Sequence, residues 1–156
     1  MNETYIKMID ENDLFSQLKD YVSKYKKSFD DSKNSILIKS MVFLKNKAKT
    51  LEDIFNNAQY IINDELKIGD EDKKLLDDQS KLIIKDFISE FEKLSSSNKE
   101  NIESIIKLLI EKHKTNFKGV GQPLRIGLVG SRYGPGLYDV ILSLDKKVVI
   151  ERLNKI

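Results

Sequence analysis

The three arginines are the side chains in this 156-residue sequence that are best suited to recognising a ligand. Arg125, Arg132 and Arg152 all lie in the C-terminal part of the chain. A guanidinium presents five donors in a planar fork that fits phosphates and base edges. From Lys112 onward there are nine Lys or Arg against three Asp or Glu, whereas the preceding part has 18 basic and 22 acidic residues. A basic end on an acidic body is typical of a protein that binds a polyanion, and an ordinary fluctuation in a Lys-rich chain explains it equally well.

Residue types that carry enzymatic chemistry are scarce. The absence of cysteine excludes disulfides and thiolate metal sites and is compatible with a reducing cytoplasm. The single histidine, His113, has no pattern of Ser, Cys or carboxylate around it, so we expect a helix-end residue rather than a triad or metal ligand. The glycine pairs 119/121 and 127/130 lack the flanking residues of dinucleotide and phosphate loops. We therefore expect no catalytic residue, no metal ligand and no cofactor within this chain.

The residues with special backbone preferences gather between Gly119 and Leu144. This stretch holds both prolines, Pro123 and Pro135, and six of the seven glycines. Two local interpretations compete for residues 122–130. Alternation of apolar and other residues there predicts a half-buried strand. A proline near the start and leucines four apart, at 124 and 128, favour a short helix instead. Nine residues are too few for periodicity to decide.

The rest of the chain is amphipathic sequence that predicts helices. Apolar spacing of three and four indicates helices within 14–25, 36–48, 51–61, 74–94 and 99–113, and a last helix after Asp145. Expected N-caps are Asn12 or Asp13, Asn98 or Ser97, and a capping box formed by Thr50 and Asp53. Residues 63–72, with Gly69, form the best linker candidate, and residues 116–121 are expected to be a loop. No apolar run is long enough to cross a membrane, and the start is not typical of a signal peptide.

The run QPLRIGLVG and, three residues later, GPGLYDVILSLDKKVVIERLNKI resemble the C-terminal end of bacterial glutamyl-tRNA synthetases. LKNKAKTLEDIFNNAQYII, residues 44–62, resembles the RAKTL helix-turn-helix region of the same family. The resemblance covers essentially the whole chain but only the C-terminal third of such an enzyme. The HIGH-like and KMSKS-like signatures of the family's catalytic part do not occur in this sequence.

The resemblance implies an all-α fold of two small helical subdomains, 1–68 and 69–156, that together form an anticodon-binding helical bundle. It favours helices over 123–130 and 136–144 in place of the strand, with Gly134 as an N-cap and Pro135 as the first helical residue. It also implies that the chain binds the anticodon loop of a glutamate tRNA, with glutamine tRNA as a second candidate. ATP and Mg²⁺ would serve a catalytic domain on the same polypeptide, and a cytoplasmic monomer is expected.

Site residues follow from the resemblance position by position. Arg125 matches the PLR arginine that contacts anticodon bases, and Gly134 and Leu137 flank the proline that approaches the anticodon. Alignment on Thr50-Leu51 puts Lys47 where some members carry an arginine that reads the last anticodon base. Five further cations are expected to contact phosphates with little sequence choice: Lys45, Lys49, Lys118, Arg132 and Lys146.

The rival interpretation is a helical protein-interaction or regulatory domain with no RNA role. In that case the basic end is merely solvated, Leu137 is packed in the core, and Arg125 is buried in an ion pair. An RNA role predicts instead that the guanidinium of Arg125 is exposed on a concave basic face beside Lys47. The surroundings of Arg125 therefore discriminate between the two classes.

Overall fold

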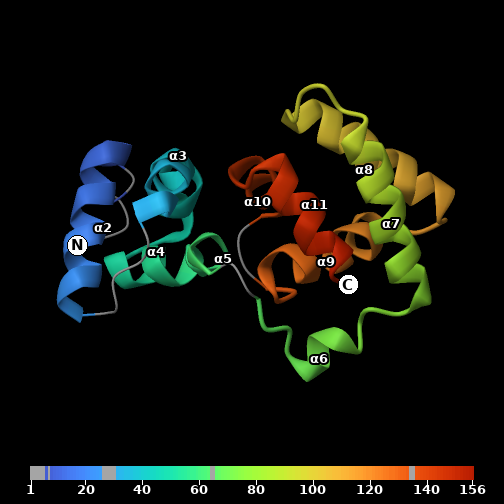
Figure 1. Cartoon of the computed structure of the whole chain (residues 1–156), viewed down its shortest axis with the longest axis horizontal. Helices are drawn as coiled ribbons and strands as arrows, with labels where there is room; N and C mark the ends of the chain where they lie inside the picture. Colours follow the sequence, from blue (N-terminus) through green and yellow to red (C-terminus); the bar gives the residue numbers. More distant parts are fainter. Residues whose placement is uncertain (1–5, 7, 26–30, 64–65, 134–135) are drawn as a thin grey trace. The chain divides into compact units, whose positions relative to one another are not determined.

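The computed structural model describes residues 6, 8–25, 31–63, 66–133 and 136–156, with the side chain of Lys47 outside this description. Throughout these residues the regular secondary structure is helical and no strand occurs, which confirms the predicted all-α fold (Figure 1). The chain divides into two compact units, Met1–Glu65 and Leu66–Ile156. The predicted division at 68 and 69 lies close to this point, and its meaning as a domain boundary stays a prediction.

The described part of the first unit contains four α-helices and two short 3-10 helices. The α-helices are α2 (Glu11–Tyr25), α3 (Asn34–Leu44), α4 (Leu51–Asn57) and α5 (Gln59–Ile62), and the 3-10 helices are Asp31–Lys33 and Lys45–Lys47. Helix α2 packs against α3 and α4 (Figure 1). The apolar side chains at three- and four-residue spacing face this contact, because burial of that stripe is what stabilises a short amphipathic helix. The fully buried ones include Leu14, Leu18, Leu37, Met41 and Ile54.

Local capping determines where two of these helices begin. The capping box is confirmed: Thr50 Oγ1 accepts from the Asp53 N–H at 3.1 Å, and Asp53 Oδ2 accepts from the Thr50 N–H at 3.3 Å. The expected cap of α2 at Asn12 or Asp13 is wrong. Helix α2 begins at Glu11, and the carboxylate of Asp10 accepts from the Asn12 N–H at 2.9 Å. An aspartate directly before the first helical residue is better placed to satisfy the free N–H groups.

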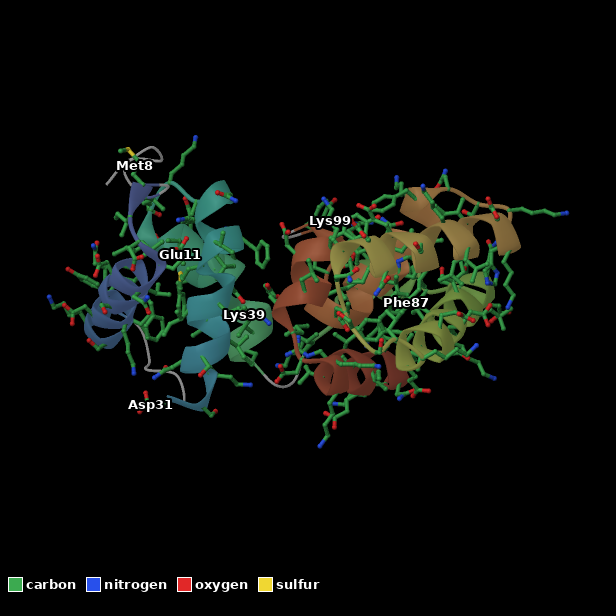
Figure 2. All side chains as sticks on the ribbon, turned by 90° about the horizontal axis from the view of Figure 1, so that it is seen from above. Met8, Glu11, Asp31, Lys39, Phe87 and Lys99 are labelled. Carbon is green, nitrogen blue, oxygen red and sulfur yellow. The ribbon has the colours of Figure 1, made fainter. Side chains whose placement is uncertain are left out.

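The second unit contains six helices in its described part. They are α6 (Asp70–Lys73), α7 (Asp78–Glu92), α8 (Lys99–Lys112), α9 (Phe117–Val129), α10 (Leu137–Ser143) and α11 (Lys146–Asn154). Helices α7, α8 and α9 pack against one another, α10 packs on α9, and α11 contacts both α7 and α9 (Figure 1). The rings of Phe87, labelled in Figure 2, and Phe91 stack at 5.3 Å in this core and are fully buried. The predicted cap Asn98 is confirmed, since its side chain accepts from the Asn101 N–H at 2.8 Å.

Helix α9 begins six residues before the predicted start at Pro123. Asn116 is its N-cap, with Oδ1 accepting from the Gly119 N–H at 2.8 Å, so the predicted loop over 116–121 is wrong. Pro123 lies inside the helix, where its missing N–H removes one hydrogen bond. The glycines serve close packing instead of a loop. A Cβ at Gly119 would collide with Thr115 Oγ1, and one at Gly127 would lie 2.8 Å from Leu153 Cδ2.

The chain leaves α9 through Gly130, which has φ +90° and whose N–H donates to the Ile126 carbonyl at 2.9 Å. A left-handed residue at this position is the usual way to end a helix, and glycine adopts it without steric penalty. The helix predicted over 136–144 is confirmed as α10. Its N-cap is Gly136 and its first residue is Leu137, so the predicted start at Pro135 is wrong. Gly134 and Pro135 themselves lie outside the described residues. No helix in the described residues has the length and apolar character needed to cross a membrane.

Candidate nucleic-acid interface

One face of α9 and the turn after it line a cavity of about 490 Å³ in the second unit. Positions 118, 122 and 125 recur at intervals of four and three, so Lys118, Gln122 and Arg125 share a helical face. Arg132 and Tyr133 reach the same cavity because the left-handed Gly130 turns the chain away from α9. The structure therefore brings together three of the predicted RNA contacts, Lys118, Arg125 and Arg132.

Arg125 is half-buried and only partly satisfied. Its Nη1 donates to the carbonyl oxygen of Arg132 at 3.2 Å. Its Nε is buried, and no described residue accepts a hydrogen bond from it. A buried donor without an acceptor costs about 1–3 kcal/mol. A structural role predicts an ion pair for Arg125. Within the described residues the guanidinium makes no such pair. It is not fully exposed either, so it is a fixed donor at the edge of a cavity.

Arg132 is held by the short helix α6. Its Nη2 lies 3.3 Å from Glu71 Oε2, and its Nε lies 3.3 Å from Asp72 Oδ1. Its guanidinium carbon is 5.2 Å from the centroid of the Tyr133 ring, within the range of a cation–π contact. The two carboxylates offset the positive charge of Arg132. Its contacts therefore also fix the position of its own carbonyl group and of the Tyr133 ring. Its predicted phosphate contact stays a prediction.

Two aromatic side chains at the cavity were not singled out from the sequence. Tyr133 is 71% exposed and Phe117 is 46% exposed. The Phe117 ring lies 6.0 Å from the ring of Tyr138, and Lys99 Nζ lies 5.7 Å from the Tyr138 centroid. Burial, assisted by the charge of Glu103, raises the pKa of Tyr138. The sequence feature that could have identified Tyr133 is its position directly after Arg132 in a glycine-rich segment.

The other two residues predicted near the anticodon are Gly134 and Leu137, of which Leu137 does not line this cavity. Gly134 lies outside the described residues. Leu137 is only 2% exposed, and a Cβ placed on Gly121 would lie 3.4 Å from its Cδ2. Leu137 thus packs against α9, and its side chain is not available at the surface. Its contact with RNA stays a prediction without support from its position.

Three predicted contacts belong to the first unit. Lys45 Nζ donates to Glu11 Oε1 at 2.7 Å and to the Ile9 carbonyl at 3.3 Å, and its side chain is only 12% exposed. The hydrogen bond from Lys45 is the main reason why the pKa of Glu11, labelled in Figure 2, lies below its ordinary value. Lys49 is exposed. Lys47 ends the second 3-10 helix, and its side chain lies outside the described residues.

Lys146 stabilises the end of a helix. Its Nζ donates to the carbonyl oxygens of Leu94 at 2.7 Å and Glu92 at 3.0 Å, and lies 5.7 Å from the Phe91 ring. A cation suits the last turn of α7, because the free carbonyls there carry partial negative charge. These contacts give Lys146 a structural role, and its phosphate contact stays an untested prediction.

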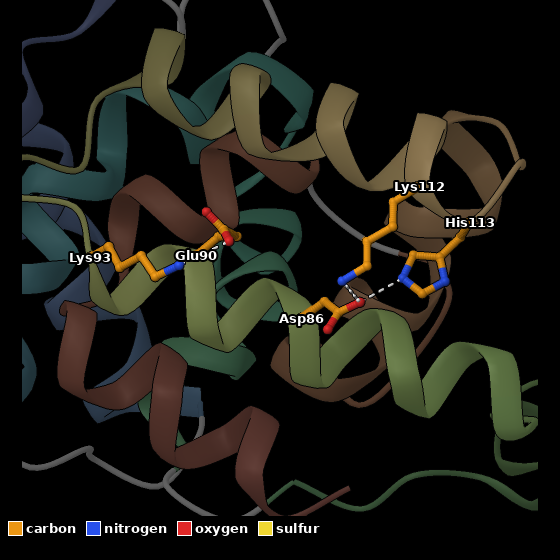
Figure 3. Close-up of polar contacts among 5 residues, drawn as sticks. All are labelled: Asp86, Glu90, Lys93, Lys112 and His113. Atoms are coloured by element: carbon orange, nitrogen blue, oxygen red, sulfur yellow. Dashed lines mark hydrogen bonds and ion pairs between the residues drawn. The ribbon is translucent and has the colours of Figure 1, made fainter.

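His113 is the C-cap of α8, as predicted for a helix-end residue. Figure 3 shows its contact with α7: His113 Nε2 lies 2.8 Å from Asp86 Oδ2, and Lys112 Nζ lies 3.0 Å from the same oxygen. Burial raises the pKa of Asp86, but the hydrogen bonds from Lys112 and His113 outweigh it and the net shift is downward. These three residues join α7 to the end of α8. Among the described residues no group of three or more His, Asp or Glu is arranged to hold a metal ion.

Comparison with known proteins covers nearly the whole chain. The family model described as an anticodon binding domain matches residues 13–156. Glutamate–tRNA ligase of Pelagibacter ubique (strain HTCC1062) is 54% identical over 157 residues, which is 100% of this chain and 34% of that protein. Glutamate–tRNA ligase of Nitrobacter hamburgensis is 29% identical over 161 residues, with 99% and 34% covered. The chain thus spans about a third of the length of these relatives.

Solved structures support the fold. A glutamate tRNA ligase from Elizabethkingia meningosepticum, crystallised in complex with its amino acid, matches with a TM-score of 0.79 and 22% identity over 99% of this chain and 30% of that one. A glutamate-tRNA synthetase from Elizabethkingia anophelis matches with a TM-score of 0.72 and the same identity and coverage. Because the family model accounts for all but the first residues, this chain belongs to the anticodon binding domain family.

Proposed function

We propose that this chain recognises the anticodon loop of a transfer RNA and that the cavity on α9 receives one of its unpaired nucleotides. The observation that carries the proposal is Arg125: a half-buried guanidinium with an unpaired Nε, in a cavity that also holds Lys118, Arg132 and two exposed rings. Anticodon bases lie in a single-stranded loop, where they can be splayed out, stacked and hydrogen-bonded. The family assignment supports the same use of the fold.

The tRNA is proposed to be a glutamate acceptor, with glutamine tRNA as the second candidate. Support comes from the relatives, which are named glutamate–tRNA ligases. In this proposal the chain contributes binding, and a catalytic domain on the same polypeptide attaches glutamate with ATP and Mg²⁺. A cytoplasmic monomer remains the expectation for this chain.

The cations at the cavity divide into two roles. Arg125 donates those guanidinium N–H groups that do not bond the Arg132 carbonyl to acceptors on a base edge, where the planar fork gives selectivity. Lys118 is exposed beside it and supplies a point charge for a phosphate. Phosphate contacts bring salt-dependent affinity with little sequence choice, whereas base contacts bring discrimination.

Titration of the full ¹⁵N-labelled chain with a glutamate-tRNA anticodon stem-loop tests the proposal. A fully base-paired RNA duplex without a loop is the control. We expect salt-sensitive shifts at Lys118, Gln122, Arg125 and Tyr133 with the loop, and weaker, diffuse shifts with the duplex. Replacement Arg125→Lys keeps the charge but removes the fork, and we expect roughly tenfold weaker binding. If the stem-loop causes no shifts even at low salt, the proposal fails.

A further inference from the structure

We propose that Tyr133 and Phe117 are base-stacking residues, which hold one extruded nucleobase in the α9 cavity while Arg125 donates to its edge. This inference rests on the proposed function and names the ligand that the cavity accepts. It assigns a role to two aromatic residues that neither the sequence motifs nor the family assignment identified.

The exposure of the two rings is unusual for this unit. The side chains of Phe87 and Phe91 on α7 are at most 1% exposed, whereas those of Tyr133 and Phe117 are 71% and 46% exposed. Single exposed aromatic side chains need no explanation. Here two of them line the same cavity, together with three cations and the amide of Gln122. Such a combination fits a ligand that is planar and apolar on its faces, polar at its edge and negatively charged nearby.

Both rings are held in place without being covered. Phe117 contacts the ring of Tyr138, which in turn lies beneath Lys99. Tyr133 lies over the guanidinium of Arg132, and its backbone N–H donates to Ser131 Oγ at 3.1 Å. Arg132 is itself fixed by the carboxylates of α6. Side chains that neighbouring contacts already restrict lose less entropy when a ligand binds, so these rings suit a stacking surface.

The polar groups favour a nucleotide over an acidic peptide. Arg125 lines the cavity and offers only donors, and its guanidinium N–H groups match a carbonyl oxygen or ring nitrogen on a base edge. An acidic peptide would use the three cations, but its carboxylates have no need of two exposed rings. Aromatic stacking of bases contributes roughly 1–3 kcal/mol per base and tolerates different sequences. The rings would therefore provide affinity, and Arg125 the choice of base.

Coupling between the ring and one base tests this inference. The full chain is titrated with the glutamate-tRNA anticodon stem-loop and with versions that are abasic at each anticodon position in turn. We expect Tyr133→Ala to bind the intact stem-loop roughly tenfold more weakly, and Tyr133→Phe to recover most of that loss because the ring remains. With the stem-loop that lacks the stacked base, Tyr133→Ala should bind no more weakly than the unaltered chain does. Phe117→Ala should behave in the same way, with α-helical circular dichroism confirming that it folds.

Tyr25 is a matched control, because it is also 71% exposed but lies at the end of α2 in the other unit. Replacement Tyr25→Ala should leave binding unchanged. If Tyr133→Ala behaves like Tyr25→Ala, or its effect adds to every abasic substitution, the stacking role is wrong while RNA binding stands. If the unaltered chain binds no stem-loop at low salt, the proposed function fails as well. Binding of an acidic peptide in place of RNA, dependent on Tyr133, would also overturn both.

Discussion

The side chain of Arg152 in α11 donates from Nη1 to the carbonyl oxygen of Leu128 in the last turn of α9, at 2.8 Å. Arg152 is only 6% exposed. The bond supplies a donor for a carbonyl oxygen near a helix end, where no following helical N–H donates to it. Of the three arginines that suggested a polyanion partner, this one stabilises the fold of the second unit.

Replacement Arg152→Met is expected to lower the free energy of unfolding by about 1–3 kcal/mol, because the Leu128 carbonyl loses its charged donor inside the protein. Urea denaturation followed by circular dichroism measures the change. Lys147→Met, on the exposed side of the same helix, is the control and should stay within about 0.5 kcal/mol. Equal effects of the two replacements would contradict the structural role of Arg152.

Asp86→Asn is expected to destabilise the second unit by about 1 kcal/mol near neutral pH, because its contacts to Lys112 and His113 weaken. The pKa of Asp86 is lower in the folded chain than its ordinary value of 3.8. Its contribution is therefore complete above that value and is lost as the pH falls through the folded pKa. Thermal unfolding measured from neutral to acidic pH should show the two proteins converging at low pH. Glu151→Gln, on an exposed face, serves as control.

Gly130→Ala is expected to destabilise the chain by about 1–2 kcal/mol, because a Cβ is disfavoured in the left-handed region and would lie 3.3 Å from the Lys67 carbonyl oxygen. Gly69→Ala is the matched control. Its nearest atom would be 3.9 Å away and its φ is −65°, so a small loss of capping and a small gain in chain entropy should nearly cancel. Melting temperatures of the two variants compare the positions directly, and a similar melting temperature for both would refute the strain at Gly130.

Lys118→Ala is expected to weaken binding of the anticodon stem-loop about equally for all loop sequences. It should also reduce the slope of log affinity against log salt by about one, since one phosphate contact is lost. Affinities measured by fluorescence anisotropy at several salt concentrations test both statements. The exposed Lys107 on α8 offers a control replacement, Lys107→Ala, which should leave the slope unchanged. A change in base preference with Lys118→Ala would assign it to base recognition instead.

Lys47 provides a prediction that rests on the resemblance alone. Because lysine is a point charge without the planar fork of arginine, we expect a relaxed preference for C over G at the third anticodon position. Lys47→Arg should sharpen that preference by roughly tenfold. Competition between the two stem-loops measures the ratio. A strong preference for C in the unaltered chain would show that another residue makes the discrimination.

The sequence by itself determined the features that depend on near neighbours. The capping box of Thr50 and Asp53 and the buried stripe of α2 were predictable because each involves residues within a turn or two of one another. The resemblance around QPLR added the helical state of 123–130 and pointed to Arg125. Composition showed that the cations gather toward the C-terminal end. Local spacing alone did not predict which of them lie together in one site.

Only the tertiary structure decided what each of those residues does. Pro123 lies inside α9, and the absence of a Cβ at Gly127 lets Leu153 of α11 approach that helix closely. Lys146 donates to the Leu94 carbonyl just after α7, and Arg152 donates to the Leu128 carbonyl in α9. Lys118 and Arg125 instead line a cavity. Leu137 is packed away and Tyr133 is left open. These outcomes depend on contacts between segments that are far apart in the chain, and a cation or ring has the same local pattern whether it meets a carbonyl, the core or solvent.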